Sequence, residues 1–198
     1  MTDRITLDVY DLRAAEYAEV TASEGPDATL QRFIDALPPG ARVLDLGCGP
    51  GTSAAYMAQS GLRPEAWDAS SGMVALAEKH PGVTARLSSF DDLTEIDAAS
   101  FDGVWANFSL LHAPRKALPR HLREIARILR PGGLFHIAVK EGTGERRDRI
   151  GRLYSYYTEG DLTRLLKDAG LSPGAYERGR DRGLDGSLSD WISVTAHA

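Results

Sequence analysis

The stretch RVLDLGCGPGTSA, residues 42–54, decides the fold of this chain. A short apolar run in it leads into a loop whose glycines are Gly47, Gly49 and Gly51, and a helix-like segment follows. Such a run is typical of the first strand-to-helix turn of an open α/β sheet, where ligands bind beyond the carboxyl ends of the strands. Glycines let a ligand approach the main chain closely, and the next helix offers free N–H groups. The stretch therefore predicts a ligand site, with a turn whose glycines serve only packing as the alternative.

Strand-like and helix-like segments alternate along the rest of the chain, which is typical of βαβ units and a parallel sheet covered on both faces. Only a loop separates the last two strands, so we expect these two to be antiparallel. The fold class predicted is α/β, a doubly wound, mainly parallel seven-stranded sheet, and the polar segment 141–153 is expected to be a loop. We expect strands over 41–46, 65–70, 83–90, 101–110, 134–140, 175–180 and 191–198, and helices over 28–37, 52–60, 71–80, 117–130 and 158–170.

Composition limits the classes of protein that the chain can be. It has 198 residues, 42% of them apolar, which predicts one domain with a full core. The net charge of −5 argues against a protein whose main function is to hold a nucleic-acid backbone. The single cysteine, Cys48, excludes an intrachain disulfide and thiolate metal sites, and no metal is predicted. We find no signal-peptide core and no apolar run of about 18 residues, so we expect a cytoplasmic protein without a membrane partner.

Four segments resemble the class I S-adenosylmethionine-dependent methyltransferases over roughly residues 8–198. VLDLGCGPG resembles their motif I, and WDASSGMVALAEK is similar to their second-strand motif. FDGVWANFSLLHAP and the LRPGG segment are similar to their fourth strand and to the turn before the fifth. The resemblance implies one Rossmann-like methyltransferase domain over 1–198, with 1–37 as an N-terminal helical lid region. Tyr10 and Tyr17 lie in that region, where an aromatic side chain can cover the cofactor.

The resemblance also implies which residues hold S-adenosylmethionine. The glycine loop would pack against the methionine part, Asp45 would orient the amino group, and Asp68 would hold the ribose hydroxyls. A carboxylate can accept from two vicinal hydroxyls, so this residue type fits. Alternatives remain open: Asp68 could cap the next helix, Asp92 could replace its neighbour Asp91, and Met73 could belong to the core. The cofactor-binding residues implied are Asp45, Gly47, Cys48, Gly49, Gly51, Asp68, Ala69, Met73, Phe90, Asp91, Asn107 and Tyr17.

His112 is the candidate catalytic residue, as a base or as a group that positions the acceptor. It follows the fourth strand, and an imidazole titrates near neutrality. A packing histidine ahead of Pro114 is the alternative. The sulfonium of the cofactor is already a good leaving group, so alignment alone can supply much of the catalysis and a base is optional. The other histidines rank lower, and His121 is expected to face solvent on its amphipathic helix.

The sequence thus predicts a methyltransferase that moves a methyl group to a small-molecule acceptor by direct displacement. The fourth strand ends in NFSL, residues 107–110, which lacks the two prolines often found in enzymes that methylate exocyclic amines of bases. The cluster Arg146, Arg147, Arg149 and Arg152 is interpreted as a solvated face, with attraction of an anionic substrate as the alternative. Other hypotheses are a non-catalytic cofactor-binding regulator and a protein or nucleic-acid methyltransferase. A nicotinamide-dependent oxidoreductase would need the longer glycine spacing.

Overall fold

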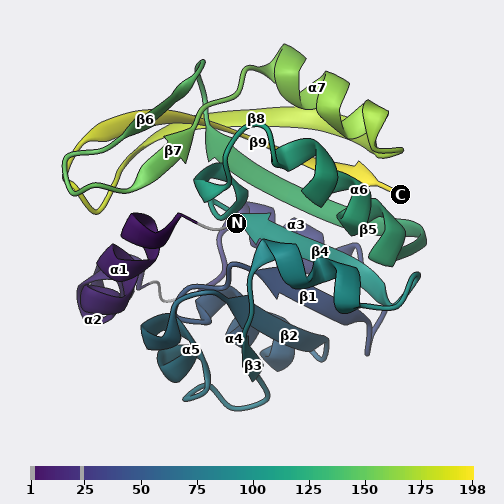
Figure 1. Ribbon diagram of the computed structural model, residues 1–198. Coiled ribbons are helices and arrows are strands. Elements are labelled where there is room, and N and C mark those ends of the chain that lie inside the picture. Colours follow the sequence, from purple (N-terminus) through teal and green to yellow (C-terminus); the bar gives the residue numbers. More distant parts are fainter. Residues whose placement is uncertain (1–2, 23–24) are drawn as a thin grey trace.

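Seven strands form one sheet at the centre of the fold, which the computed structural model describes for residues 3–22 and 25–198. Their order is β3-β2-β1-β4-β5-β9-β8 (Figure 1), so the order reverses between β1 and β4. Neighbours from β3 to β5 are parallel, and β9 is antiparallel to β5 and β8. The predicted doubly wound, mainly parallel sheet is confirmed. Its strands are β1 (Arg42–Leu46), β2 (Arg63–Asp68), β3 (Thr84–Leu87), β4 (Phe101–Asn107), β5 (Leu129–Lys140), β8 (Ser172–Arg182) and β9 (Leu188–His197).

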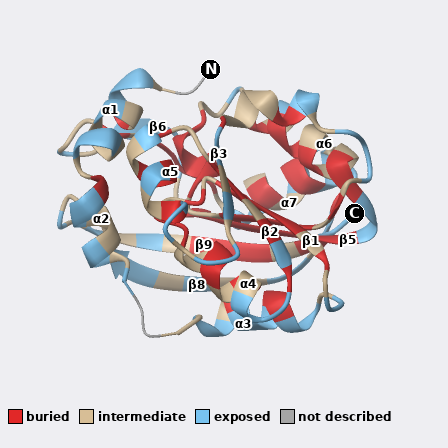
Figure 2. Cartoon of the chain, turned by 90° about the horizontal axis from the view of Figure 1, so that it is seen from below, coloured by how far each residue is buried: buried red, intermediate tan, exposed pale blue. Residues whose placement is uncertain are grey.

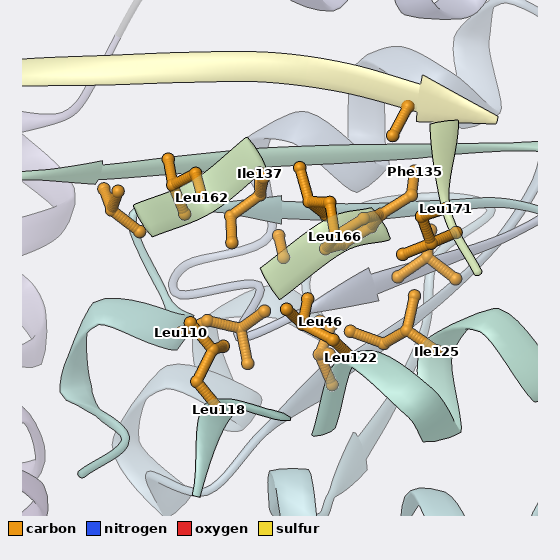
Figure 3. Close-up of a cluster of buried hydrophobic side chains, with 14 of the residues drawn as sticks. Leu46, Leu110, Leu118, Leu122, Ile125, Phe135, Ile137, Leu162, Leu166 and Leu171 are labelled. Carbon is orange, nitrogen blue, oxygen red and sulfur yellow. The ribbon is translucent and has the colours of Figure 1, made fainter. Parts of the chain in front are cut away.

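Helices cover both faces of the sheet. Because successive side chains of a strand point to opposite faces, Val43 packs with α3 and α4 while Leu44 packs with α6 and α7. Buried residues follow the strands and the inner sides of the helices (Figure 2). Figure 3 shows the larger cluster, in which leucines of α6 and α7 meet Phe135 and Ile137 of β5. The bounds are α3 (Ala28–Asp35), α4 (Thr52–Gln59) and α5 (Ser71–Ala77) on one face, and α6 (Leu118–Ile128) and α7 (Glu159–Asp168) on the other.

Side-chain caps explain where several of these helices begin. Ser70 caps α5 by accepting from the main-chain N–H of Met73, which leaves Asp68 free for another role. Thr158 caps α7 in a reciprocal pair with Asp161, as its place before the helix predicts. Two short 3-10 helices, η1 (Phe90–Glu95) and η2 (Leu110–His112), follow β3 and β4. The strands predicted over 83–90 and 101–110 therefore end earlier.

The N-terminal region lies at the carboxyl end of the sheet. α1 (Arg4–Leu12) and α2 (Ala14–Val20) pack against α5, beside the β6–β7 hairpin (Figure 1). α3, which belongs to the predicted lid range 1–37, packs instead into the core through Leu30, Phe33 and Ile34. Positions 1–2 and 23–24 of that range lie outside the described residues. The helices that stand over the end of the sheet are therefore α1 and α2.

Three local predictions are wrong. Segment 141–153 is not a plain loop, because β6 (Glu145–Arg147) pairs with β7 (Leu153–Ser155). His121 does not face solvent: it is 2% exposed and packs edge-on against Phe90, because η1 covers that side of α6. Arg152 does not belong to a solvated face, since it is 1% exposed and pairs with Asp148. The other three arginines of that cluster are exposed, as expected.

The described helices do not reach the dimensions of a membrane span. The longest of them, α6, has 11 residues, against the roughly 20 apolar residues that a spanning helix needs.

Candidate functional site

The glycine loop between β1 and α4 has a left-handed backbone at Gly47, Gly49 and Gly51, with φ of +76°, +54° and +85°. A Cβ at Gly47 would lie 2.3 Å from the Cβ of Ser109, and one at Gly51 would lie 2.7 Å from that of Ala77. Gly49 is different, because its nearest neighbour would be a ring carbon of Tyr17 at 3.5 Å. The two outer glycines are therefore required by close packing, and the middle one presents bare backbone beneath the ring of Tyr17, on the wall of the cavities described next.

Two cavities flank this loop and share five residues, Tyr17, Gly47, Gly49, Asn107 and Phe108. The first extends along the ends of β2 and β3, where Asp68, Ala69, Met73, Ser88, Ser89 and Phe90 line it. The second, of about 310 Å³, extends over β1 and α4, where Asp45, Cys48 and Thr52 line it. Both lie at the point where the strand order reverses, which is the usual ligand crevice of such sheets.

Asp68 ends β2 and fastens the glycine loop. One carboxylate oxygen accepts from the main-chain N–H of Gly49 at 2.9 Å, and the other accepts from that of Ser70 at 2.9 Å. The carboxylate also lines the first cavity. Burial raises the pKa of Asp68, and the hydrogen bonds from the two amides oppose that rise. Asp68 thus combines support of the loop with an acceptor group facing the cavity.

Asp45 is the second carboxylate beside the loop. It is 2% exposed, and its Oδ2 has no hydrogen-bond partner among residues 3–22 and 25–198. Burial, with a smaller contribution from Asp68, raises the pKa of Asp45 to about 7. A buried carboxylate with an unpartnered oxygen on a cavity wall is suited to a cationic group of a ligand.

The other residues implied to bind the cofactor do not all meet at the cavities. Asn107 and Tyr17 line both cavities, and Tyr17 lies over Gly49. Asp91 lines neither cavity, because its carboxylate pairs with Arg120, while Asp92 caps η1 through the N–H of Ser89. Gly51 lines neither cavity. Ala69, Met73 and Phe90 line the first cavity, and Cys48, which is buried, lines the second.

Helix α1 forms one wall of the first cavity. Thr6, Leu7 and Tyr10 line it, and Asp11 docks the helix onto the start of α5. One oxygen of Asp11 accepts from the hydroxyl of Ser70 at 2.7 Å and from the N–H of Gly72 at 3.0 Å. Nothing in the sequence marked Asp11, because its partners lie about 60 residues further along the chain.

His112 is buried against α1 and has both ring nitrogens engaged. Nδ1 lies 2.7 Å from the carbonyl oxygen of Leu153, which can only accept, so Nδ1 carries the proton. Nε2 therefore accepts from the hydroxyl of Tyr10 at 2.8 Å. Tyr10 in turn accepts from Nη1 of Arg152 at 2.9 Å. Burial lowers the pKa of His112 to about 3, so the ring is neutral at physiological pH.

Phe108 is a residue of the site that the sequence did not indicate. It follows β4 with φ of +54°, a left-handed conformation that bulky residues rarely adopt. Phe108 lines both cavities. Strain of this kind is found at ligand sites held by the surrounding structure.

The comparisons with known proteins agree with this geometry. Residues 43–133 match a family model described as a methyltransferase domain. A demethylmenaquinone methyltransferase of Beutenbergia cavernae is 36% identical over 163 residues, which are 80% of this chain and 63% of that protein. The chain therefore spans less than two thirds of the length of that relative.

Solved structures extend the likeness over the whole chain. The 1,6-didemethyltoxoflavin-N1-methyltransferase of Burkholderia thailandensis, crystallised with bound 1,6-didemethyltoxoflavin and S-adenosylhomocysteine, is 28% identical with a TM-score of 0.74. The match covers 98% of this chain and 87% of that one. The [4+2]-cyclase SpnF, 20% identical with a TM-score of 0.76 over 96% of this chain and 94% of its own, shares the fold alone. Residues 43–133 of this chain form a methyltransferase domain, and the fold of the whole chain is that of the class I S-adenosylmethionine-dependent methyltransferases.

Proposed function

We propose that the chain binds S-adenosylmethionine in the two cavities around Gly49 and transfers its methyl group to a small-molecule acceptor. The observation that carries the proposal is the buried, unpartnered carboxylate oxygen of Asp45 beside the bare backbone of Gly49. Such an oxygen needs a donor, and the ammonium of the cofactor's methionine part is one. The relatives named above act on small molecules, which favours an acceptor of that kind.

Each cavity would hold one part of the cofactor. In the second, Asp45 would accept from the amino group, with the main-chain carbonyl of Asn107 as a further acceptor. In the first, Asp68 would accept from the ribose hydroxyls while Ala69, Met73 and Phe90 enclose the adenine. In the structure the carboxylate of Asp91 pairs with Arg120. Asp91 would accept from the adenine amino group only after that ion pair breaks. Gly47 and Gly49, which line both cavities, would shape the wall between the two parts, and Gly51 would support the loop through its packing on Ala77.

The residues of the chain supply alignment and exclusion of water. When bound, the cofactor supplies a methyl group on a positively charged sulfur, which is itself a good leaving group. Of the lid proposed over residues 1–37, helices α1 and α2 would cover the site through Tyr10 and Tyr17. Orientation of this kind can supply on the order of 7–11 kcal/mol. His112 would act by positioning the hydroxyl of Tyr10, because that hydroxyl occupies the Nε2 lone pair that a base would need.

A second candidate is a regulator that binds the cofactor without turnover, since so few catalytic groups are required. Turnover with a panel of small acceptors separates the two, whereas cofactor binding is common to both. The net charge of −5 disfavours a nucleic-acid substrate.

S-Adenosylhomocysteine is expected to stabilise the protein, whereas NAD is not. At about 100 times its Kd a ligand adds about 2.7 kcal/mol to the free energy of unfolding, which for this chain length raises Tm by roughly 5–10 °C.

Asp68→Ala is expected to weaken binding of S-adenosylhomocysteine by about 1–3 kcal/mol, because ribose hydroxyls and the Gly49 amide lose their acceptor. Thermal shift and titration calorimetry measure the two effects.

Asp97→Ala is the matched control for Asp68→Ala. Asp97 is exposed and lines neither cavity, so the variant removes the same charge at a position outside the site. Its affinity should equal that of the natural protein. No shift with S-adenosylhomocysteine on folded protein would overturn the proposed function, and an unchanged affinity of Asp68→Ala would remove that residue from the site.

Binding of S-adenosylhomocysteine is expected to release protons through Asp45. Its pKa of about 7 leaves it largely protonated below neutrality in the free protein. A bound ammonium favours the ionised carboxylate, so affinity should rise with pH between about 5.5 and 7 and then level off. Calorimetry in buffers of different ionisation enthalpy counts the protons released, and Asp45→Asn should lose that release. Proton uptake by the natural protein, or an equal release from the variant, would contradict this role.

A further inference from the structure

A third cavity, of about 410 Å³, adjoins the two already described. It shares Tyr10 with the first cavity, and Tyr17 and Phe108 with both. Its other side is built by the end of β5 and by the β8–β9 hairpin, which contributes Trp191. The cavity therefore lies on the side of Phe108 where an acceptor could reach a methyl group held beside the glycine loop.

One ammonium group lines this cavity without a hydrogen-bond or ion-pair partner in the described part of the chain. Lys140 ends β5 and is 8% exposed, yet no hydrogen bond or ion pair to its Nζ occurs within the described ranges of the chain. Nζ lies 3.7 Å from the centroid of the Tyr154 ring. Burial lowers the pKa of Lys140, with a further contribution from Arg152, while Asp185 and Asp148 oppose it. An ammonium on a largely buried side chain, with an aromatic ring but no hydrogen-bond acceptor beside it, favours an anionic ligand on the cavity side.

The other charged side chains of the cavity already have partners. Arg152 pairs with Asp148, whose oxygen lies 2.8 Å from Nη2. Asp27 accepts from the N–H of Leu30 as the cap of α3. Asp181 accepts from the indole N–H of Trp191 at 2.6 Å. Arg182 donates to the carbonyl oxygen of Gly186. Lys140 is thus the cation of the cavity that has neither a hydrogen bond nor an ion pair within the described residues, whereas Arg152 is paired with Asp148 through Nε and keeps an Nη2 donor without a hydrogen-bond acceptor.

The walls near Lys140 are flat and held in place. The indole of Trp191 lies directly on the backbone of Gly179, where a Cβ would be 2.2 Å from a ring carbon. Its N–H is fixed by Asp181, and the ring of Phe108 meets it edge-on at 6.0 Å between centroids. Aromatic walls of this kind favour a planar ring, which packs in offset or edge-on contact.

We propose that this cavity binds the methyl acceptor, and that the acceptor is a planar aromatic molecule with an ionised hydroxyl held by Lys140. The proposal rests on the proposed function above, because it places this molecule beside the cofactor. The ammonium would donate a charge-assisted hydrogen bond to the phenolate oxygen and so favour the ionised form over the neutral phenol. The ionised oxygen would also be a stronger nucleophile than the neutral hydroxyl. Its bond to the methyl carbon would form as the carbon–sulfur bond breaks, and the electron pair of that bond would leave with the sulfur as a neutral thioether.

The test uses 4-nitrophenol as probe, because its ionised form is yellow and its neutral form is not. The full chain is first saturated with S-adenosylhomocysteine, and the probe is then titrated at a pH where it is mostly neutral in solution. The natural protein should bind the probe as the yellow anion. Lys140→Met should bind it about 10- to 100-fold more weakly and without the colour change, since a hydrogen bond to a charged group is lost.

Two variants control the experiment. Lys140→Arg keeps the charge and should keep the yellow form. Lys116→Met removes the same charge from an exposed position outside the cavity and should behave like the natural protein. Binding of S-adenosylhomocysteine should be the same in all four proteins, because Lys140 lines neither of the first two cavities.

The outcomes separate the two proposals. Failure of the natural protein to bind S-adenosylhomocysteine overturns the proposed function itself. Normal binding of S-adenosylhomocysteine with no bound probe, with a probe that stays neutral, or with equal probe affinity in Lys140→Met overturns the role of Lys140 and the acceptor class.

Discussion

Gly47→Ala is expected to destabilise the protein by roughly 2–5 kcal/mol, the sum of about 1–2 kcal/mol for a left-handed alanine and about 1–3 kcal/mol for overpacking. The backbone at Gly47 has φ of +76°, and an added Cβ would lie 2.3 Å from that of Ser109. Ser109 cannot retreat easily, because it is buried and its hydroxyl donates to the carbonyl of Leu46 at 2.5 Å. Unfolding in urea, followed by tryptophan fluorescence, measures the loss.

Gly61→Ala is the matched control for the backbone contribution. Gly61 has a similar φ of +83°, but nothing lies within 4 Å of an added Cβ. It should lose only the conformational part, and the double variant Gly47→Ala with Ser109→Gly should recover part of the larger loss. Equal destabilisation by the two single variants would show that the overlap with Ser109 has no effect.

Arg152→Met is expected to destabilise the protein by about 3–5 kcal/mol, because it leaves the carboxylate of Asp148 buried and unpaired. The side chains of this pair are 2% and 5% exposed, and Nε of Arg152 also donates to Asp148 at 2.9 Å. The change further removes the donor to the hydroxyl of Tyr10, so α1 loses one of its attachments to the β6–β7 hairpin. Denaturation in urea again reports the free energy of unfolding.

The exposed pair of Arg164 and Asp168 provides the comparison. These side chains are 61% and 65% exposed, so Arg164→Met should change stability by less than about 1 kcal/mol. A double variant, Arg152→Met with Asp148→Leu, should be more stable than the sum of its single changes predicts, because no unpaired charge remains. Additive losses at 148 and 152 would mean that the pair does not act as a unit.

The same fold serves different reactions, as the likeness to a [4+2]-cyclase illustrates. The function of this chain therefore depends on particular side chains and not on the sheet. Asp45 and Asp68 were implied by the resemblance of VLDLGCGPG and WDASSGMVALAEK to the family's motifs, and both line the cavities beside the glycine loop. Lys140 also ends a strand, but a lone lysine in a sequence is ordinarily exposed, so nothing marked it.

Prediction failed where burial depends on distant segments. His121 has the spacing of an outer helix position, yet η1, some 30 residues earlier, covers it. Segment 141–153 is polar and glycine-bearing, which is typical of a loop, but its residues pair across a hairpin. Asp91 was implied by resemblance, and its carboxylate instead pairs with Arg120 of α6.

The amino-acid sequence by itself determined the alternation of strands and helices, the glycine turn after β1 and the carboxylates beside it. These features depend on local periodicity and backbone preference, which a short stretch of chain expresses alone. Only the tertiary structure decided which charges are buried and what they face. Arg152 reaches Tyr10, which lies 142 residues earlier, and Lys140 faces a cavity whose other walls come from α2 and the β8–β9 hairpin. The environment of such a side chain is made by segments that meet only after folding, so no pattern along the chain contains it.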